Sequence, residues 1–269
     1  MKQFLVCIDS DGCAIDSMEI KHRRCFGPCM IDEFGLERWR EAILDRWNQI
    51  NLYSMTRGIN RFLGLEIILR EVDSTYLAID GLDAYSAWCR QTSVFSNTAI
   101  EAMCGSHPVF SKVLAWSQAV NRSIEGISDE ICPFDGVGEA LHTMRACADI
   151  AIVSSANPQA VRDEWTRFGF MNCVDHMMAQ DAGTKSDCIR KLLSLGYTCD
   201  HVLMIGDAPG DAKAAQENGV LYYPILAGNE TASWKQLREE AFPRLMENRF
   251  DEVYQKQLIE AFEKNLSRQ

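Results

Sequence analysis

The stretch Phe4-Leu5-Val6-Cys7-Ile8-Asp9-Ser10-Asp11-Gly12 decides the fold. An apolar run of strand type ends there in two aspartates and a glycine. A strand that is apolar throughout is typical of a parallel sheet covered on both faces, and such sheets bind ligands beyond the carboxyl ends of their strands. We therefore expect a buried strand over residues 4–8 that delivers Asp9 and Asp11 to a crevice.

The spacing of the two aspartates brings negative charge into one small volume. Side chains two residues apart in an extended chain project the same way, and two carboxylates repel each other unless a divalent cation, a lysine or a bound proton compensates them. Gly12 permits a tight turn or a close ligand approach. An isolated Asp-x-Asp-Gly is also a common turn that ends a strand, so the pair alone favours that simpler interpretation.

Composition narrows the possible functions. The 269 residues are 47% hydrophobic, which is enough for one large domain or two of ordinary size. The formal charge of −11 argues against a nucleic acid partner, because such binding needs clustered Lys and Arg. An anionic small molecule would need a local positive site. The sequence sets no oligomeric state.

The 11 cysteines are odd in number and scattered, and Cys7 and Cys132 lie in apolar runs, which indicates buried free thiols in a reducing compartment. The chain enters its first predicted strand at once, so we expect no signal peptide. Because no apolar stretch reaches the roughly 20 residues of a membrane span, we also expect no membrane partner. These features predict a cytoplasmic protein.

Residues 15–131 are predicted to form an all-helical insertion large enough to hold its own core. Helices are expected over residues 59–72 and 108–120. A further apolar face recurs at three- and four-residue spacing and includes a tryptophan stripe that we interpret as core rather than as a ligand cage: Leu36, Trp39, Ile43, Trp47 and Ile50.

From Cys132 onward, strands and helices alternate. Strands are predicted over residues 150–153, 174–179, 202–205 and 220–225, with helices over 137–147, 186–195 and 211–218 and another beginning at Asn157-Pro158. Repeated strand–helix units indicate a parallel sheet with helices on both faces, which the first strand joins. The expected fold class is α/β, a Rossmann-like doubly wound core of residues 1–14 and 132–230. Residues 231–269 are expected to add two helices, broken at Pro243, that pack on this core.

Polar residues follow the predicted strands. Ser154 and Ser155 are able to hold a phosphate beside the free N–H groups of a helix start, or are ordinary helix caps. Lys185 neutralises carboxylates and phosphate if it projects into the crevice, and is otherwise a solvated lysine. Asp207 is a hard oxygen ligand suited to Mg²⁺, and Asp211, one turn on, is a second ligand, a partner of the first, or a first-turn helix aspartate. Their combination favours phosphate chemistry.

In this order the motifs resemble those of the haloacid dehalogenase superfamily of aspartate-nucleophile phosphohydrolases. They read apolar-Asp9-x-Asp11-Gly12, apolar-Ser154, Lys185 and apolar-Gly206-Asp207-x-x-x-Asp211. The pair Asp16-Ser17 is similar to the β-phosphoglucomutase and phosphoglycolate phosphatase branch.

The resemblance implies a set of site residues. Asp9 would form an aspartyl phosphate, while Asp11 would protonate the leaving oxygen and then deprotonate the attacking water. Asp9, the Asp11 carbonyl and Asp207, with Asp211, would hold Mg²⁺. Stabilisation of the phosphoryl oxygens would come from Ser154 and Lys185, with Ser155 as a substrate-binding candidate.

The resemblance also implies that the helical insertion is a mobile cap that closes over the site and selects substrates. Arg57 and Arg61 are then candidate substrate anchors, although arginines on an amphipathic helix are commonly solvated. The expected function is that of an Mg²⁺-dependent phosphatase acting on a small phosphorylated metabolite such as a sugar phosphate. The alternatives are a phosphomutase of the β-phosphoglucomutase type and a non-catalytic binding protein with a vestigial site.

Overall fold

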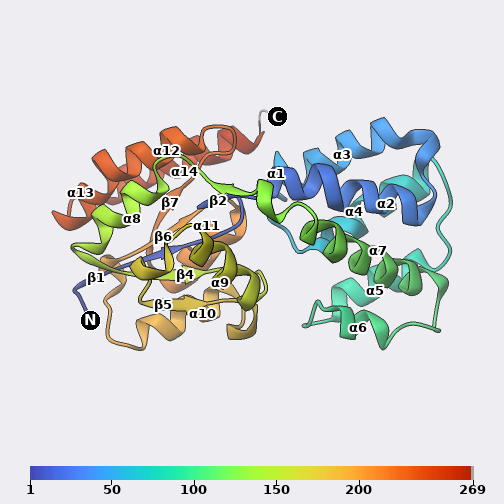
Figure 1. The fold of residues 1–269 in the computed structure, drawn as a ribbon, viewed down its shortest axis with the longest axis horizontal. Helices are drawn as coiled ribbons and strands as arrows, with labels where there is room; N and C mark the ends of the chain where they lie inside the picture. Colours follow the sequence, from blue (N-terminus) through green and yellow to red (C-terminus); the bar gives the residue numbers. More distant parts are fainter. Residues whose placement is uncertain (268–269) are drawn as a thin grey trace. The chain divides into compact units, whose positions relative to one another are not determined.

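The computed structural model describes residues 1–267 and divides the chain into two compact units (Figure 1). The sheet unit comprises Met1–Met18 and the chain from Cys132 onward, and the helical unit is Glu19–Ile131. The helical unit therefore begins four residues later than the boundary at Ile15 expected from the sequence. Ile15–Asp16 forms strand β2, which pairs antiparallel with β3 (Cys132–Pro133) inside the sheet unit.

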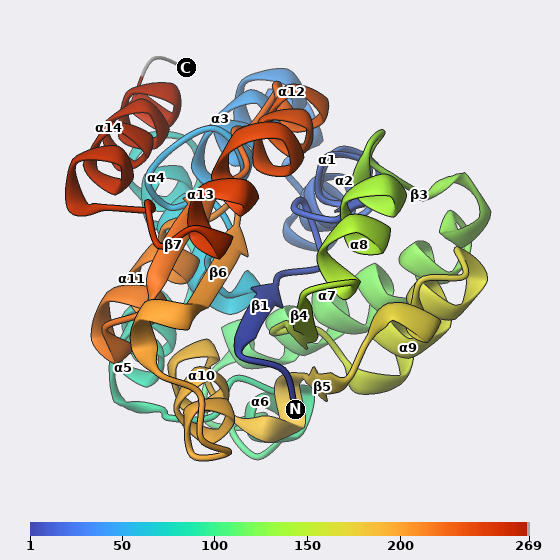
Figure 2. The same cartoon turned by 90° about the vertical axis from the view of Figure 1, so that its left-hand side faces the viewer.

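The sheet unit is built on five parallel strands in the order β5-β4-β1-β6-β7. All residues of the central strand β1 are buried, as its continuous apolar sequence predicts. This sheet, with helices on both faces (Figure 2), confirms the predicted doubly wound α/β class. The strands are β1 (Phe4–Ile8), β4 (Ala148–Val153), β5 (His176–Met178), β6 (Val202–Gly206) and β7 (Leu221–Pro224).

Side chains alternate along the strands, so each face of the sheet packs against its own set of helices. Leu5 and Cys7 of β1 share a core with α10 (Lys185–Leu193), α11 (Pro209–Asn218) and α14 (Glu252–Ser267). On the opposite side Figure 2 shows α8 (Val137–Arg145) and α9 (Pro158–Arg167). Each helix start follows its local chemistry: Asn157 caps α9, and Thr184 with Asp187 forms a capping box at α10.

The carboxyl-terminal region corrects one prediction. The chain remains helical from α12 (Glu230–Gln236) through a π-helical turn (Leu237–Ala241) into α13 (Phe242–Met246). Pro243 lies in the first turn of α13, where its missing N–H is tolerated, so the predicted break at Pro243 is wrong. The break falls between Met246 and Glu252, where Asn248 has a positive φ of 53°.

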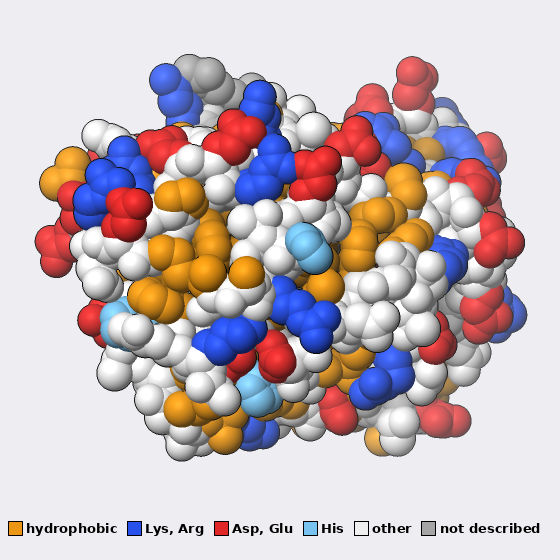
Figure 3. All heavy atoms as spheres, turned by 60° about the vertical axis from the view of Figure 1, so that its left-hand side comes forward, with side chains coloured by type: hydrophobic (Ala, Val, Ile, Leu, Met, Phe, Trp, Pro, Cys, Tyr) orange, Lys and Arg blue, Asp and Glu red, His pale blue; other side chains and the backbone are white. Residues whose placement is uncertain are grey.

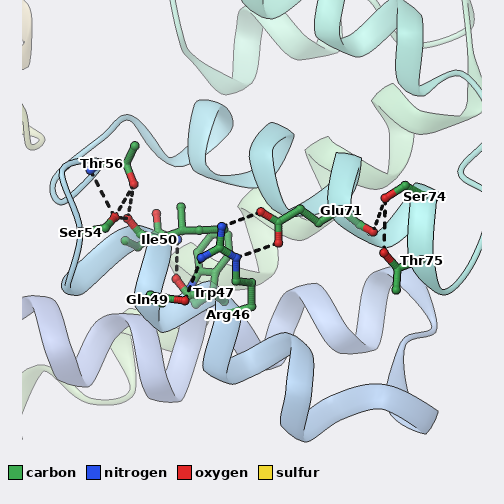
Figure 4. A network of polar contacts seen from close by, with 10 residues as sticks. Arg46, Trp47, Gln49, Ile50, Ser54, Thr56, Glu71, Ser74 and Thr75 are labelled. Carbon is green, nitrogen blue, oxygen red and sulfur yellow. Dashed lines mark hydrogen bonds and ion pairs between the residues drawn. The ribbon is translucent and has the colours of Figure 1, made fainter. Parts of the chain in front are cut away.

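The helical unit has its own apolar core. Trp47, Trp116 and Phe62 lie at its centre and are almost completely buried, so the tryptophan stripe serves packing as predicted. Arg46 of α3 binds Glu71 of α4 through two hydrogen bonds of 2.8 and 2.7 Å (Figure 4). The helices are α1 (Met18–Lys21, which begins in the sheet unit), α2 (Gly27–Phe34), α3 (Arg40–Leu52), α4 (Arg61–Thr75), α5 (Leu82–Gln91), α6 (Asn97–Glu101) and α7 (Pro108–Glu125).

The surface corrects one prediction, because Cys132 is exposed, whereas Cys7 is buried as expected. Figure 3 shows Lys and Arg side chains interspersed with Asp and Glu over much of the visible face. Across residues 1–267, every helix falls short of the length and apolar character that a membrane span requires.

Asp149 in β4 provides a test of how the sheet unit responds to pH. Its carboxylate accepts hydrogen bonds from the Lys2 backbone N–H and from the Tyr197 hydroxyl, both at 2.7 Å. Burial of this carboxyl opposes its ionisation, but the hydrogen bonds from Tyr197 and Lys2 prevail and lower the pKa of Asp149.

We expect Asp149→Asn to lower the free energy of unfolding at pH 7 by about 1–3 kcal/mol, because a charged acceptor is lost. A pKa that is lower in the folded state adds stability above the ordinary carboxyl pKa, and this contribution is lost as pH falls through the folded-state value. The difference between the two proteins should therefore shrink below about pH 4 in urea titrations. A difference that stays constant with pH would contradict this, and Tyr197→Phe, which keeps the carboxylate, should lose less.

Candidate functional site

The segment after β1, residues 9–15, is here named the Asp9 loop. The Asp9 N–H donates to the Ile205 carbonyl at 3.0 Å and so extends the ladder with β6 by one bond. The chain then turns tightly, since the Ser10 carbonyl accepts hydrogen bonds from the amides of Ala14 and Ile15 at 3.0 and 2.9 Å. Gly12 has a φ of 78°, so the expected turn at this glycine is present.

Four side chains from three separate parts of the sequence meet at the end of β1. Lys185 Nζ lies 2.8 Å from Asp9 Oδ2 and 2.6 Å from Asp211 Oδ1. Carboxylate oxygens of Asp9, Asp207 and Asp211 lie within 4.8 Å of one another, and we name these three residues the acidic cluster. Their residues are at most 5% exposed, and the Lys185 side chain is 15% exposed.

The charges of this group do not balance. When all three carboxyls are ionised, they exceed the single ammonium of Lys185 by two negative charges. Burial raises the pKa of Asp9, the Lys185 ammonium opposes this, and Asp211 adds repulsion. Burial disfavours the Lys185 ammonium, but Asp211 and Asp9 prevail and raise its pKa. The lysine thus stays protonated, and the hard oxygen donors beside it suit a divalent cation such as Mg²⁺.

Asp211 is committed to contacts within the protein. Its Oδ1 binds Lys185, and its Oδ2 accepts a hydrogen bond from the Ala208 N–H at 3.0 Å. This geometry favours the alternative in which Asp211 supports the group that holds a cation. The Asp211 carboxyl also lies directly against Gly206, where a β-carbon would come within 2.2 Å of Asp211 Cγ. The sequence placed Gly206 only within a motif and gave no sign of this steric requirement.

Asp11 has a partner within its own segment. The Ser17 hydroxyl, which is fully buried, donates to Asp11 Oδ1, while Asp11 itself is half-buried. Ser17 thereby orients the second aspartate of the motif. The sequence identified Asp16-Ser17 by spacing alone and did not predict this bond.

Ser154 and Ser155 follow β4, the strand that pairs with β1. Ser154 is 2% exposed, and its hydroxyl accepts a hydrogen bond from the Ala156 N–H at 3.1 Å, whereas Ser155 is exposed. Asn157 caps α9, so the interpretation of the two serines as helix caps is wrong. Because β4 runs parallel to β1 and ends at Val153, Ser154 lies at the same sheet edge as Asp9.

Arg57 and Arg61 belong to the helical unit. Arg57 is 5% exposed and donates to the Leu52 carbonyl at 2.7 Å. Arg61 donates to Asn121 Oδ1 at 2.8 Å, and its guanidinium carbon lies 5.1 Å from the centre of the Phe26 ring. Both arginines thus have partners within their own unit, and the alternative of a fully solvated side chain is wrong for Arg57.

Two tryptophans in contact with the Asp9 loop were missed by sequence reasoning. The indole N–H of Trp165 in α9 donates to Ser10 Oγ, and that of Trp234 in α12 donates to the Cys13 carbonyl, each at 2.9 Å. A tryptophan in an amphipathic helix carries no sequence signal that distinguishes such a contact from ordinary packing.

Comparison with known proteins agrees with this geometry. The family model described as haloacid dehalogenase-like hydrolase matches residues 90–223, a range that contains Ser154, Lys185, Asp207 and Asp211. The chain belongs to the haloacid dehalogenase-like hydrolases. The prediction of an enzyme is confirmed at this level, and a search of curated proteins gives no match.

Solved structures give the same fold. A haloacid dehalogenase-like family protein from Streptococcus pneumoniae matches at 15% identity and a TM-score of 0.55, over 88% of this chain and 91% of the other. A candidate phosphoglycolate phosphatase from Lactobacillus delbrueckii subsp. bulgaricus matches at 15% identity and 0.55, over 89% and 92%. A hydrolase from Pseudomonas syringae matches at 15% and 0.51, over 87% and 90%. At this identity the likeness establishes the fold.

The contact between Gly206 and Asp211 yields a prediction with an internal control. Gly206→Ala should lower the free energy of unfolding by about 1–3 kcal/mol, because the added methyl group displaces the Asp211 carboxyl. Gly210→Ala, four residues on in α11, adds a β-carbon with no atom within 4 Å and should be neutral or stabilising by up to about 1 kcal/mol. Urea unfolding of both variants measures the difference, and equal stabilities would refute the steric argument.

Proposed function

We propose that this protein is an Mg²⁺-dependent phosphatase that hydrolyses a small phosphorylated metabolite through an aspartyl phosphate on Asp9. The observation that carries the proposal is the buried acidic cluster bound to Lys185 at the end of β1. A further cation would stabilise a buried group with excess negative charge, and a cation beside a nucleophilic carboxylate is suited to phosphoryl transfer.

The reaction divides into two displacements. In the first, an Asp9 carboxylate oxygen forms a bond to phosphorus, the bond from phosphorus to the ester oxygen breaks, and Asp11 gives its proton to that oxygen. In the second, Asp11 takes a proton from water, the water oxygen bonds to phosphorus, and the bond between phosphorus and the Asp9 oxygen breaks, which regenerates the Asp9 carboxylate and frees inorganic phosphate. Ser17 takes no part in the transfer itself. Its hydroxyl donates a hydrogen bond to the Asp11 carboxylate and so keeps that carboxylate in one orientation.

The remaining residues stabilise charge. Lys185 is protonated beside Asp9 and so lies where an incoming phosphoryl oxygen would need a positive partner. Ser154 is proposed to bind another phosphoryl oxygen, with Ser155 as a weaker substrate contact. Asp9, the Asp11 carbonyl and Asp207 would hold Mg²⁺, with Asp211 as their support. When bound, the cation offsets the charge of the carboxylates and of the transferring phosphoryl group.

The helical unit is proposed to act as a cap that selects the substrate. Arg57 and Arg61 are its candidate substrate anchors. A sugar phosphate or a short phosphorylated acid suits two guanidinium groups, and one neighbour in structure is a candidate phosphoglycolate phosphatase. A cytoplasmic location is proposed as well, because all 11 cysteines are free thiols.

Asp9→Asn tests the nucleophile. Hydrolysis of p-nitrophenyl phosphate should fall at least about 10³-fold while the thermal midpoint is maintained, because the amide cannot form the acyl phosphate. Asp11→Asn should still become labelled by a radioactive phosphoryl donor but turn over slowly. The control is Asp200→Asn, whose side chain is 76% exposed. Wild-type rates in Asp9→Asn would defeat the assignment.

Removal of the cation tests the charge argument. Millimolar Mg²⁺ should raise the thermal midpoint of the wild type, since a ligand at about 100 times its Kd stabilises the folded state by about 2.7 kcal/mol. Asp207→Asn should lose this shift, and Asp200→Asn should keep it. Differential scanning calorimetry with and without EDTA provides the measurement. An equal shift in Asp207→Asn would place the cation elsewhere.

A further inference from the structure

The Asp9 loop is held by side chains from outside the sheet. Trp234 lies 221 residues from Cys13 in the sequence, and its indole N–H donates to the Cys13 carbonyl at 2.9 Å. A second indole, that of Trp165, donates to Ser10 Oγ at 2.9 Å. All four of these residues are fully buried. The two indoles therefore fix the loop at two points between Asp9 and the following strand.

The helix that carries Trp234 is held by hydrogen bonds of the neighbouring residue. Its neighbour Ser233 accepts a hydrogen bond at its carbonyl from the Tyr223 hydroxyl at 2.7 Å. The Ser233 hydroxyl donates to the Asn229 carbonyl at 2.9 Å and accepts from the Leu226 N–H at 3.1 Å. The start of α12 is thereby tied to β7 and to the turn that follows it. A fixed helix gives the indole a fixed direction.

The loop needs such external partners. After the bond from the Asp9 N–H to the Ile205 carbonyl, the backbone of the loop leaves the sheet. The Ser10 carbonyl then accepts hydrogen bonds from the amides of Cys13, Ala14 and Ile15. The Cys13 carbonyl, at the tip of this turn, is paired with the indole of Trp234. A buried carbonyl that loses its donor is costly, so the turn without this bond would adopt other conformations.

We propose that Trp234, in the carboxyl-terminal helices beyond the family match, is a positioning residue for Asp9 and Asp11. The inference rests on the proposed function: the nucleophile and the acid flank Ser10, so a shift of the turn moves both carboxylates relative to the phosphoryl group. Trp165 supports the same loop from α9. A displacement of about 1 Å at a reacting group is enough to cost about 10²-fold in rate.

The test compares two indoles that make the same kind of bond. Trp234→Phe removes the N–H and keeps an aromatic ring. The matched control is Trp116→Phe in the helical unit, because Trp116 is also fully buried and donates to a backbone carbonyl, that of Phe26, at 3.1 Å. Trp165→Phe applies the same comparison to the second indole that binds the loop, through the Ser10 hydroxyl, and replaces Trp234→Phe if that variant fails to fold.

Three readouts are taken on the full chain: the thermal midpoint, kcat and KM for p-nitrophenyl phosphate, and hydrogen exchange at the amides of residues 12–15. We expect Trp234→Phe to reduce kcat by about 10- to 100-fold with KM nearly unchanged. Exchange at residues 12–15 should be at least tenfold faster than in Trp116→Phe at a comparable thermal midpoint.

Two results would overturn the proposal. Loop exchange equal in the Trp234→Phe and Trp116→Phe variants would mean that the indole does not hold the turn. Faster exchange with an unchanged kcat would mean that it holds the turn without positioning the reacting groups. If the wild type hydrolyses no phosphate ester, the proposed function fails, and exchange still decides separately whether Trp234 orders the loop.

Discussion

The buried ammonium of Lys185, bound to Asp9 and Asp211, constrains the rest of the sheet unit. A charge this deeply buried is stable only with partners in good geometry, and removal of the lysine would leave Asp9 and Asp211 without a compensating charge. The three residues come from the end of β1, the start of α10 and the first turn of α11. The relative positions of these elements are therefore limited by a contact of 2.8 Å on one side and 2.6 Å on the other.

The packing of α10 against α11 meets this constraint. Asn218 at the end of α11 donates to the carbonyl and hydroxyl of Ser186 at 3.1 and 3.0 Å, so the two helices are joined next to the lysine. Thr184 and Asp187 fix the start of α10 through the capping box. The lysine is thus directed by a helix terminus whose position is set by short-range hydrogen bonds. Residues 184–187 therefore fix the start of α10 and also direct Lys185 to Asp9.

The sequence predicted those features that depend on nearby residues. The apolar run before Asp9 and the strand–helix alternation after Cys132 identified the sheet, because a strand buried on both faces consists of consecutive apolar residues. The break assigned to Pro243 was wrong because proline is compatible with a first helical turn as well as with a helix end. The fit of Gly206 against Asp211 and the bond from Trp234 to Cys13 depend on tertiary packing, and no local pattern encodes them.

The Asp9 loop depends on hydrogen-bond partners from several separate parts of the sheet unit. A parallel strand supplies backbone partners only along its length, so a chain that leaves the sheet to present a nucleophile must find others. Here the Phe134 N–H donates to the Ala14 carbonyl at 3.1 Å and the Trp234 indole donates to the Cys13 carbonyl, while Trp165 binds the Ser10 hydroxyl. Residues before β4, within α9 and within α12 therefore share in holding one short turn. The carboxyl-terminal helices are connected to the acidic cluster through the hydrogen bond from Trp234 to this backbone.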